Sequence, residues 1–262
     1  MEDFLATGTL RLRKNRIDDV FFSGMAAVIL ISVLVGFSQT FFQAPLPNLI
    51  VHIHTGVFSL WIILLIVQTS LLAAERPDLH RRLGLLGFGL ACLVVVFGVL
   101  VATENLVRNY PGFNPVDHGV NFRAFYAVSL SDMLMFSTLM FFAFRKRFEP
   151  AAHKRLVLIA TLAITDAAFD RWPIPVGWWD FRVTPLLCIY PLLFLLGAYD
   201  WWSTRRIQPA TLWGQHIFSC CSARKRCTRS HRHLAAICHL GVCAFTAFSL
   251  KSHLADCRQS PS

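Results

Sequence analysis

Two histidines occupy the same place in a short pattern that appears twice in the chain. His80 in PDLHRRLG and His153 in PAAHKRLVL are each followed by two basic residues, a leucine and a long apolar run. Neutral imidazoles that face one another from neighbouring helices can supply both axial ligands of a haem iron. Adjacent basic residues, including Arg82 and Arg155, could pair with the haem propionates. The alternative is that both histidines only begin their helices at a membrane interface, beside basic residues that fix the topology.

A second group of histidines lies toward the other end of the predicted helices. His52 and His54 occur in NLIVHIHTGVF, and His118 precedes a later apolar run. A second haem at this end would use His54 or His52, with His118 as the candidate partner. Because residues two positions apart point different ways from a helix, His52 and His54 cannot act together.

Two carboxylates fall in the middle of apolar runs, where ionisable groups are costly and are functional sites by default. They are Asp132 in SLSDMLMF and Asp166 in ATLAITDAAFDRW. They could belong to a proton or substrate path, or they could share one proton. A structural account is equally open, in which they bond to polar neighbours in the bundle: Ser131, Thr165, Gln68 or Asn48.

The apolar residues come in blocks long enough to cross a membrane, which takes about 20 residues per helix. Of 262 residues, 55% are hydrophobic and 15% charged, and the mean hydropathy is +0.52. A soluble domain has roughly 45–50% apolar and about 25% charged residues, so this class is excluded. The pattern predicts an all-α polytopic transmembrane helix bundle over 21–204 with six spans, at 21–42, 49–74, 83–104, 123–144, 155–170 and 183–202.

The positions of Lys and Arg predict the orientation, because short cytoplasmic loops are rich in these residues. Basic residues precede the first span and follow the second, fourth and sixth spans, whereas the other loops carry few. The N-terminal segment 1–20 and the end of the sixth span are therefore expected in the cytoplasm. This orientation puts His80 and His153 together on the cytoplasmic side of the lipid bilayer.

The formal net charge of +10 belongs to the C-terminal tail. Residues 205–262 carry nine Lys and Arg against one acidic residue, together with six of the eight cysteines. The charge therefore does not indicate nucleic acid as a partner. This Cys/His-rich tail is expected to be disordered or partly membrane-associated, or to carry no selected structure; a zinc module is disfavoured because no C-x-x-C pair occurs. The apolar run 234–250 is of marginal length for a seventh span.

Three stretches, HIHTGVFSLWIILLIVQ, LHRRLGLLG and AAHKRLVLIATLAITDAAFDRW, resemble a group of uncharacterised bacterial multi-pass membrane proteins. That group is distantly similar to the di-haem transmembrane cytochrome b superfamily. The resemblance covers approximately residues 20–205. It implies a four-helix core with one haem near each face, ligated by histidines from alternate helices. His80 and His153 match the inner arrangement; His54 could match the outer one, although no histidine lies within the fourth span.

Two functions of different classes follow. The first is a haem b-binding electron carrier or oxidoreductase subunit in the cell (inner) membrane, with an unidentified protein or electron-transfer partner. The alternative is a haem-free transporter, assembly factor or structural bundle. In that alternative Asp132 and Asp166 form the polar centre, and the histidines only line the interfaces.

Overall fold

The structure is a computed structural model that describes residues 2–43, 49–108, 122–172 and 184–230. Within these ranges the chain is helical and contains no strand, which confirms the predicted all-α class. The helices are α1 (Glu2–Gln43), α2 (Leu49–Ala73), α3 (Pro77–Arg108), α4 (Phe122–Arg145), α5 (Pro150–Ile164), α6 (Asp166–Phe169), α7 (Thr184–Thr204) and α8 (Pro209–Ser230).

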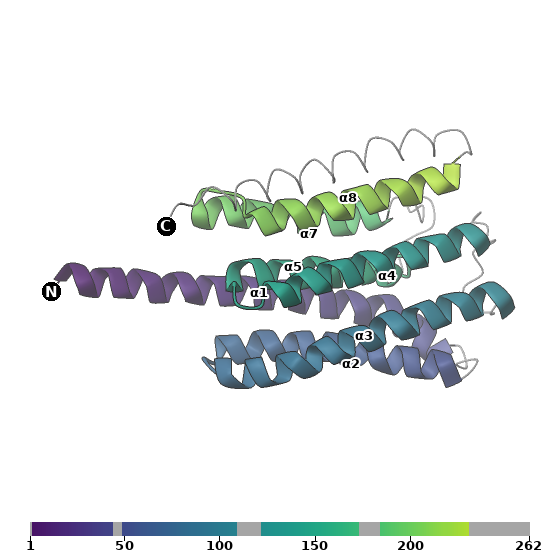
Figure 1. The fold of residues 1–262 in the computed structure, drawn as a ribbon, viewed down its shortest axis with the longest axis horizontal. Helices are drawn as coiled ribbons and strands as arrows, with labels where there is room; N and C mark the ends of the chain where they lie inside the picture. The colour runs from purple at the N-terminus through teal and green to yellow at the C-terminus, as the bar shows by residue number, and fades with distance from the viewer. Residues whose placement is uncertain (1, 44–48, 109–121, 173–183, 231–262) are drawn as a thin grey trace, which may run out of the picture.

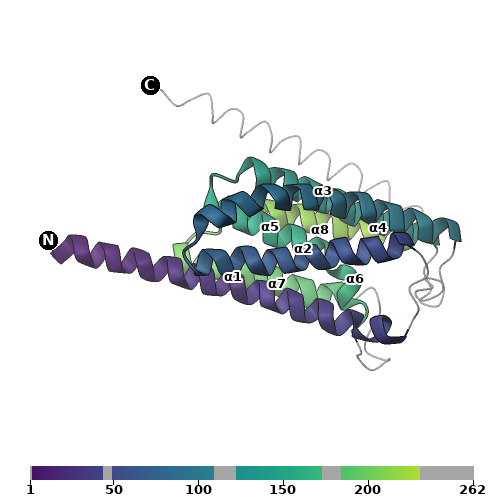
Figure 2. The same ribbon diagram turned by 90° about the horizontal axis from the view of Figure 1, so that it is seen from below.

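The long helices lie side by side as a bundle (Figures 1 and 2). Helix α2 packs on α1 and α3, and α4 packs on α3 and α5. Proline sets the beginnings of α3 and α5, since its fixed φ and missing N–H suit the first turn of a helix. Glu75, with φ of 55°, reverses the chain between α2 and α3, and Arg205, with φ of 56°, follows the end of α7.

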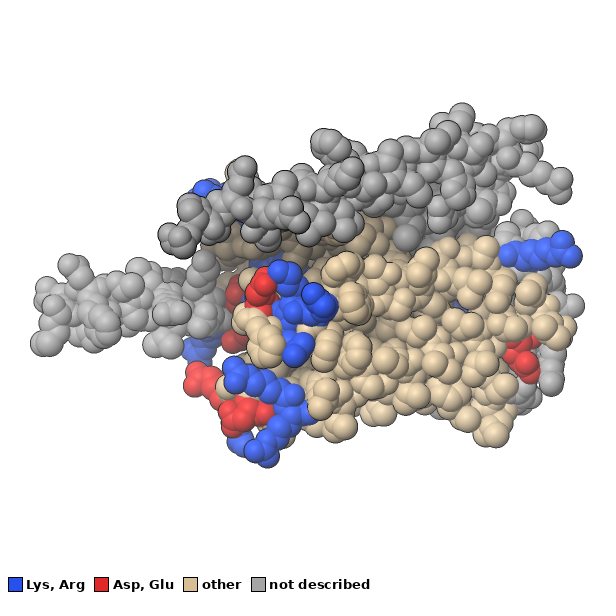
Figure 3. Space-filling view, in the orientation of Figure 1, with Lys and Arg blue, Asp and Glu red and all other residues tan. Residues whose placement is uncertain are grey.

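Among the described residues, four helices are long and apolar enough to cross a membrane: Arg16–Ser38 in α1, Leu49–Ala73 in α2, Pro77–Val107 in α3 and Phe125–Arg145 in α4. Figure 3 shows why lipid suits this surface: an uncharged band lies between two charged ends. Most blue side chains on this face gather at the end that holds the α2–α3 and α4–α5 turns. The part of the chain described here is therefore a membrane-type helical bundle.

The six predicted spans are confirmed only in part, because the last two differ from the prediction. The predicted span 155–170 is divided: α5 has 15 residues and ends at Ile164, and the four-residue α6 begins at Asp166. Fifteen residues are fewer than the about 20 that a spanning helix needs. Helix α7 covers the predicted sixth span and contains Pro191, but it is not among the four candidate spans.

Helix α5 is the centre of the bundle rather than a lipid-facing helix. Eight of its 15 residues are buried, including Ile159, Ala160 and Leu162 with no exposed surface. It contacts α1, α4, α6 and α8. Since hydropathy does not distinguish a helix surrounded by lipid from one surrounded by protein, α5 looks like a span in the sequence.

The predicted tail begins as an ordered helix. Helix α8 packs against α5 and α4, with Thr211 and Phe218 buried and Gly214 beside Ile159. Residues 209–230 are thus helical rather than disordered. The remainder of the tail, with the possible span 234–250, lies outside the described residues. From Glu2 onward the predicted N-terminal segment 1–20 is helical and continuous with α1.

Candidate functional site

The structure brings His80 and His153 together, from the first turns of α3 and α5. Their ring centres are 6.4 Å apart and their planes lie at 87°. Pro77 and Pro150 begin the two helices, so each histidine is the fourth residue of its helix. Both backbone N–H groups make the first helical bond, to the carbonyl four residues earlier. The shared Pro-x-x-His spacing therefore puts both side chains in the same register.

His153 has one nitrogen committed to the protein and one that is not. Its Nδ1 lies 2.9 Å from the carbonyl oxygen of Ala143 in α4. A carbonyl oxygen only accepts hydrogen bonds, so Nδ1 carries the proton and Nε2 keeps its lone pair. Histidines that bind metals or ligands are oriented in this way by a backbone acceptor on the other nitrogen.

His80 is held through its own Nδ1 by Gln68 of α2. The Gln68 amide satisfies its neighbours when its nitrogen faces His80: that nitrogen is then 2.5 Å from His80 Nδ1, and its oxygen accepts from Gly84 N at 3.1 Å. The backbone carbonyl oxygen of Gln68 is farther away, at 3.4 Å from His80 Nδ1, which is the outer limit for a hydrogen bond. When the amide oxygen accepts from Gly84 N, the amide nitrogen faces His80 Nδ1 and donates to it, so in this arrangement Nδ1 accepts and Nε2 carries the proton.

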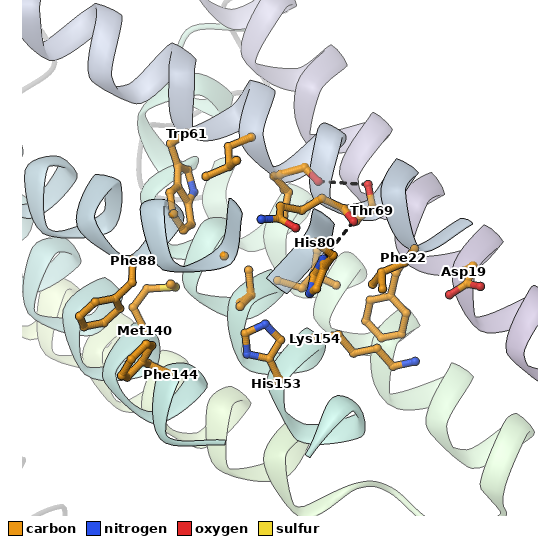
Figure 4. A pocket seen from close by; sticks show the side chains of 18 residues that line it. Asp19, Phe22, Trp61, Thr69, His80, Phe88, Met140, Phe144, His153 and Lys154 are labelled. Atoms are coloured by element: carbon orange, nitrogen blue, oxygen red, sulfur yellow. Dashed lines mark hydrogen bonds between the residues drawn. The ribbon is translucent and has the colours of Figure 1, made fainter. Parts of the chain in front are cut away.

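Beside the two imidazoles lies a partly enclosed cavity of about 140 Å³, formed by α1 to α5. Figure 4 shows His80 and His153 pointing toward one another, with Trp61, Phe88 and Phe144 around them. The rings of Phe88 and Phe144 stack with centres 4.2 Å apart. The site is thus a small, mainly apolar chamber, and its polar lining consists of the two imidazoles with Asp19, Gln68, Thr69 and Lys154.

Arg155, one of the residues predicted to contact a haem propionate, has a different role. Its Nε and Nη2 donate to Asp200 Oδ1 of α7 at 2.8 and 2.5 Å, and its Nη1 donates to Ala151 O at 2.6 Å. Arg155 is 2% exposed and Asp200 is fully buried. Arg155 does not line the cavity. Its guanidinium holds α5 to α7, so the structure does not bring Arg155 to the histidine pair.

The other basic residues near the histidine pair, Lys154 and Arg82, are either paired with a carboxylate or lie outside the cavity. Lys154 lines the cavity, but its Nζ is 2.6 Å from Asp18 Oδ2 of α1. The remaining Asp18 oxygen accepts from the Tyr199 hydroxyl of α7. Arg82 is exposed on α3 and does not line the cavity. Of the two arginines assigned to the site, neither is brought to the histidines.

The outer histidines are not joined into a second site by the described residues. His52 is exposed, whereas His54 is half-buried and its ring lies 4.1 Å from that of Phe58. His118, the predicted partner, lies outside the described residues. In the described ranges no group of three or more His, Cys, Asp or Glu side chains could hold a metal ion.

The two carboxylates that were predicted to lie within spans are on separate elements and are both half-buried. Asp132 is in α4, and Asp166 is the first residue of α6. Two of the hydroxyls considered as their partners bond elsewhere: Ser131 donates to Ala127 O, and Thr165 donates to Leu162 O. The Gln68 amide contacts His80 instead. Asn48 lies outside the described residues. The predicted Asp132 and Asp166 pairing stays a prediction.

Gln68 and Trp61 are site residues that the sequence did not single out as such. Trp61 Nε1 donates to Thr161 Oγ1 of α5 at 3.3 Å, and its ring meets Phe136 edge-on at 5.3 Å. The only available signal was that a polar or amphipathic residue interrupts the apolar face of 49–74. This signal does not indicate which helix the residue faces.

Trp61→Phe should lower the free energy of unfolding by about 0.5–1.5 kcal/mol, the net worth of one hydrogen bond. Thr161 keeps its own bond to Val157 O at 2.9 Å, so its hydroxyl is not left without a partner. The measurement is thermal unfolding of the detergent-solubilised protein, with Trp202→Phe at an exposed position as control. A larger loss for Trp202→Phe would contradict the assigned contact.

In comparisons with protein-family models, curated proteins and solved structures, no match to this chain is found.

Proposed function

We propose that this protein is a membrane electron carrier or oxidoreductase subunit that holds a redox-active group between His80 and His153. The observation that carries the proposal is the paired arrangement of two imidazoles, each bound to the protein through Nδ1, so that both Nε2 atoms are left for a ligand. We place the pair at the cytoplasmic side of the inner membrane. The concentration of basic side chains at the α2–α3 and α4–α5 turns supports that orientation.

Haem b is the group that the sequence resemblance implies, and the two donors fit it. His80 and His153, whose ring centres are 6.4 Å apart, would hold the iron through their imidazole nitrogens, and the group would supply one-electron chemistry. Ligation requires an unprotonated Nε2 on His80, so the Gln68 amide would turn and accept from Nδ1–H.

The space beside the donors does not fit a haem. Pockets for drug-sized ligands have roughly 300–1,000 Å³, and a tetrapyrrole is at least as large, whereas this cavity has about 140 Å³. The arginines assigned to the propionates are also engaged or distant, since Arg155 is bound to Asp200. A haem would therefore require α3 and α5 to separate.

The absorption spectrum of the reduced protein tests the haem directly. If haem b is the bound group, protein purified from haem-replete cells should show Soret and α bands, and both His80→Ala and His153→Ala should abolish them, because each removes one axial ligand. His52→Ala, at an exposed position, is the matched control and should leave the bands unchanged. Absence of bands in the unaltered protein would remove haem from the proposal.

The break in the fifth predicted span favours a second candidate function, a haem-free transporter. Discontinuous helices at mid-membrane depth commonly form the substrate sites of transporters. Here α5 ends at Ile164, and the intramembrane carboxylate of Asp166 begins α6. Uptake into proteoliposomes driven by a pH gradient tests it. Under this candidate the unaltered protein should show uptake that Asp166→Asn abolishes. Under the first candidate neither protein should show uptake.

A further inference from the structure

We infer that the cavity between His80 and His153 binds the hydroxyl-bearing ring of a lipid-soluble phenol or hydroquinone. The hydroxyl oxygen would accept from His80 Nε2–H, and the hydroxyl hydrogen would be donated to His153 Nε2. The inference rests on the proposed function in taking the histidine pair as the binding centre. It goes further in naming the chemical class of the ligand.

The size and lining of the cavity suit a single six-membered ring. Its volume is about 140 Å³, and an apolar cavity of about 150 Å³ is known to bind benzene. Aromatic side chains from α2, α3 and α4 line it, among them Trp61, Phe88 and Phe144. Such walls contact the faces and edges of an aromatic ligand favourably.

The two tautomers make the pair one donor and one acceptor. His153 must donate from Nδ1 to Ala143 O, so its Nε2 accepts. His80 accepts at Nδ1 from Gln68, so its Nε2 donates. A hydroxyl accepts and donates at once and matches both nitrogens. A metal cation would need two lone pairs, and a carboxylate would need two donors.

The position of the cavity favours a ligand that reaches it through the membrane. Gly84 lines the cavity and is itself exposed, so the cavity opens at the surface of α3. A Cβ on Gly84 would meet nothing within 4 Å. Leu85 and Leu86, which follow Gly84, are 68% and 70% exposed, whereas the exposed residues before it are Arg81 and Arg82, so the opening lies where apolar and basic surface meet.

Calorimetric titration with p-cresol and p-xylene tests the inference, because the two probes differ by a hydroxyl in place of a methyl group. The solubilised full chain should bind p-cresol saturably and p-xylene at least tenfold more weakly. Two lost hydrogen bonds account for that factor, although p-xylene is the more hydrophobic probe. Equal affinity for both probes would overturn the inference.

Two variants show where the probe binds. Gly84→Leu adds a side chain at the opening of the cavity and should abolish p-cresol binding, whereas Gly89→Leu, on the same helix and outside the cavity, should not. His153→Phe should remove the preference for p-cresol over p-xylene, since it keeps a ring and loses the acceptor. If Gly84→Leu still binds p-cresol, the probe binds outside this cavity and the inference is wrong.

The outcomes separate this inference from the proposed function. Haem bands together with no p-cresol binding would uphold the histidine pair as a redox centre and refute the single-ring ligand. Selective p-cresol binding without haem bands would support the single-ring ligand. Neither bands nor binding would refute both.

Discussion

Asp200→Ala is expected to destabilise the folded bundle by about 3–5 kcal/mol, the cost of leaving one partner of a buried ion pair alone. Arg155 would remain in the interior with its charge uncompensated, since Asp200 accepts two of its hydrogen bonds. The other Asp200 oxygen accepts from Thr211 Oγ1 at 2.5 Å and Gln208 N at 3.2 Å. The substitution therefore loosens α5, α7 and the beginning of α8 together.

This loss should also affect the histidine pair, because His153 is on the same helix, two residues before Arg155. The measurement is thermal unfolding in detergent, followed by size-exclusion chromatography to detect aggregated protein. Lys146→Ala is the matched control: Lys146 and Glu149 form an exposed ion pair at 2.7 Å, and such pairs contribute about 0–1 kcal/mol.

A double variant distinguishes the ion pair from simple loss of volume. Replacing a buried ion pair by apolar residues of similar size is often neutral or stabilising. Arg155→Met with Asp200→Leu should therefore recover much of the stability that Asp200→Ala loses, less the bonds to Thr211 and Gln208. A double variant that is less stable than Asp200→Ala would contradict the assignment of the cost to an uncompensated Arg155.

The meeting of His80 and His153 could be predicted because it depends on local sequence. A helix that begins at proline has its fourth residue at a fixed register, and the pattern places a histidine there twice. The partners of the imidazoles could not be predicted in the same way. Gln68 and the carbonyl of Ala143 come from α2 and α4, and their contacts depend on how each helix is rotated about its axis, which hydropathy alone does not specify.

The roles of the charged residues were the least predictable part of the site. Arg155 lies next to Lys154 in the sequence, yet one points to Asp200 of α7 and the other to Asp18 of α1. Adjacent helical residues point about 100° apart, so the two cations reach different carboxylates, although both lie over the ring of Phe22. Rules for membrane topology treat both residues as interfacial charges. In the structure, their ion pairs join α5 to α1 and to α7.

Only four of the six predicted spans are supported, for a related reason. Hydropathy finds apolar segments but does not show whether lipid or protein surrounds them. The first four predicted spans expose much of their apolar surface, as in Leu60, Leu93 and Phe141. The fifth predicted span is enclosed by protein, and its helix ends at Ile164 with Thr165 as the capping residue. Basic composition likewise gave no sign of the helix at the beginning of the tail, where α8 packs on α4 and α5.

Gly36→Ala should destabilise the bundle at this break, where α6 approaches α1 most closely. A Cβ at Gly36 would overlap the carbonyl oxygen of Ala168 and lie 2.8 Å from its carbon. These are backbone atoms and cannot rotate away, so α6 must move. Trp172, which donates to Ser32 O at 3.2 Å, would move with it. Overpacking of this kind costs about 1–3 kcal/mol.

Gly24→Ala on the same helix is the matched control, because its Cβ would meet nothing within 4 Å. Alanine stabilises a helix interior by about 0.5–1 kcal/mol relative to glycine. The two substitutions make the same chemical change and should have opposite signs in thermal unfolding. Equal stabilisation by both would mean that α6 does not lie against α1. If the signs differ, close packing of α1 on α6 fixes the end of α5, and with it the helix that presents His153.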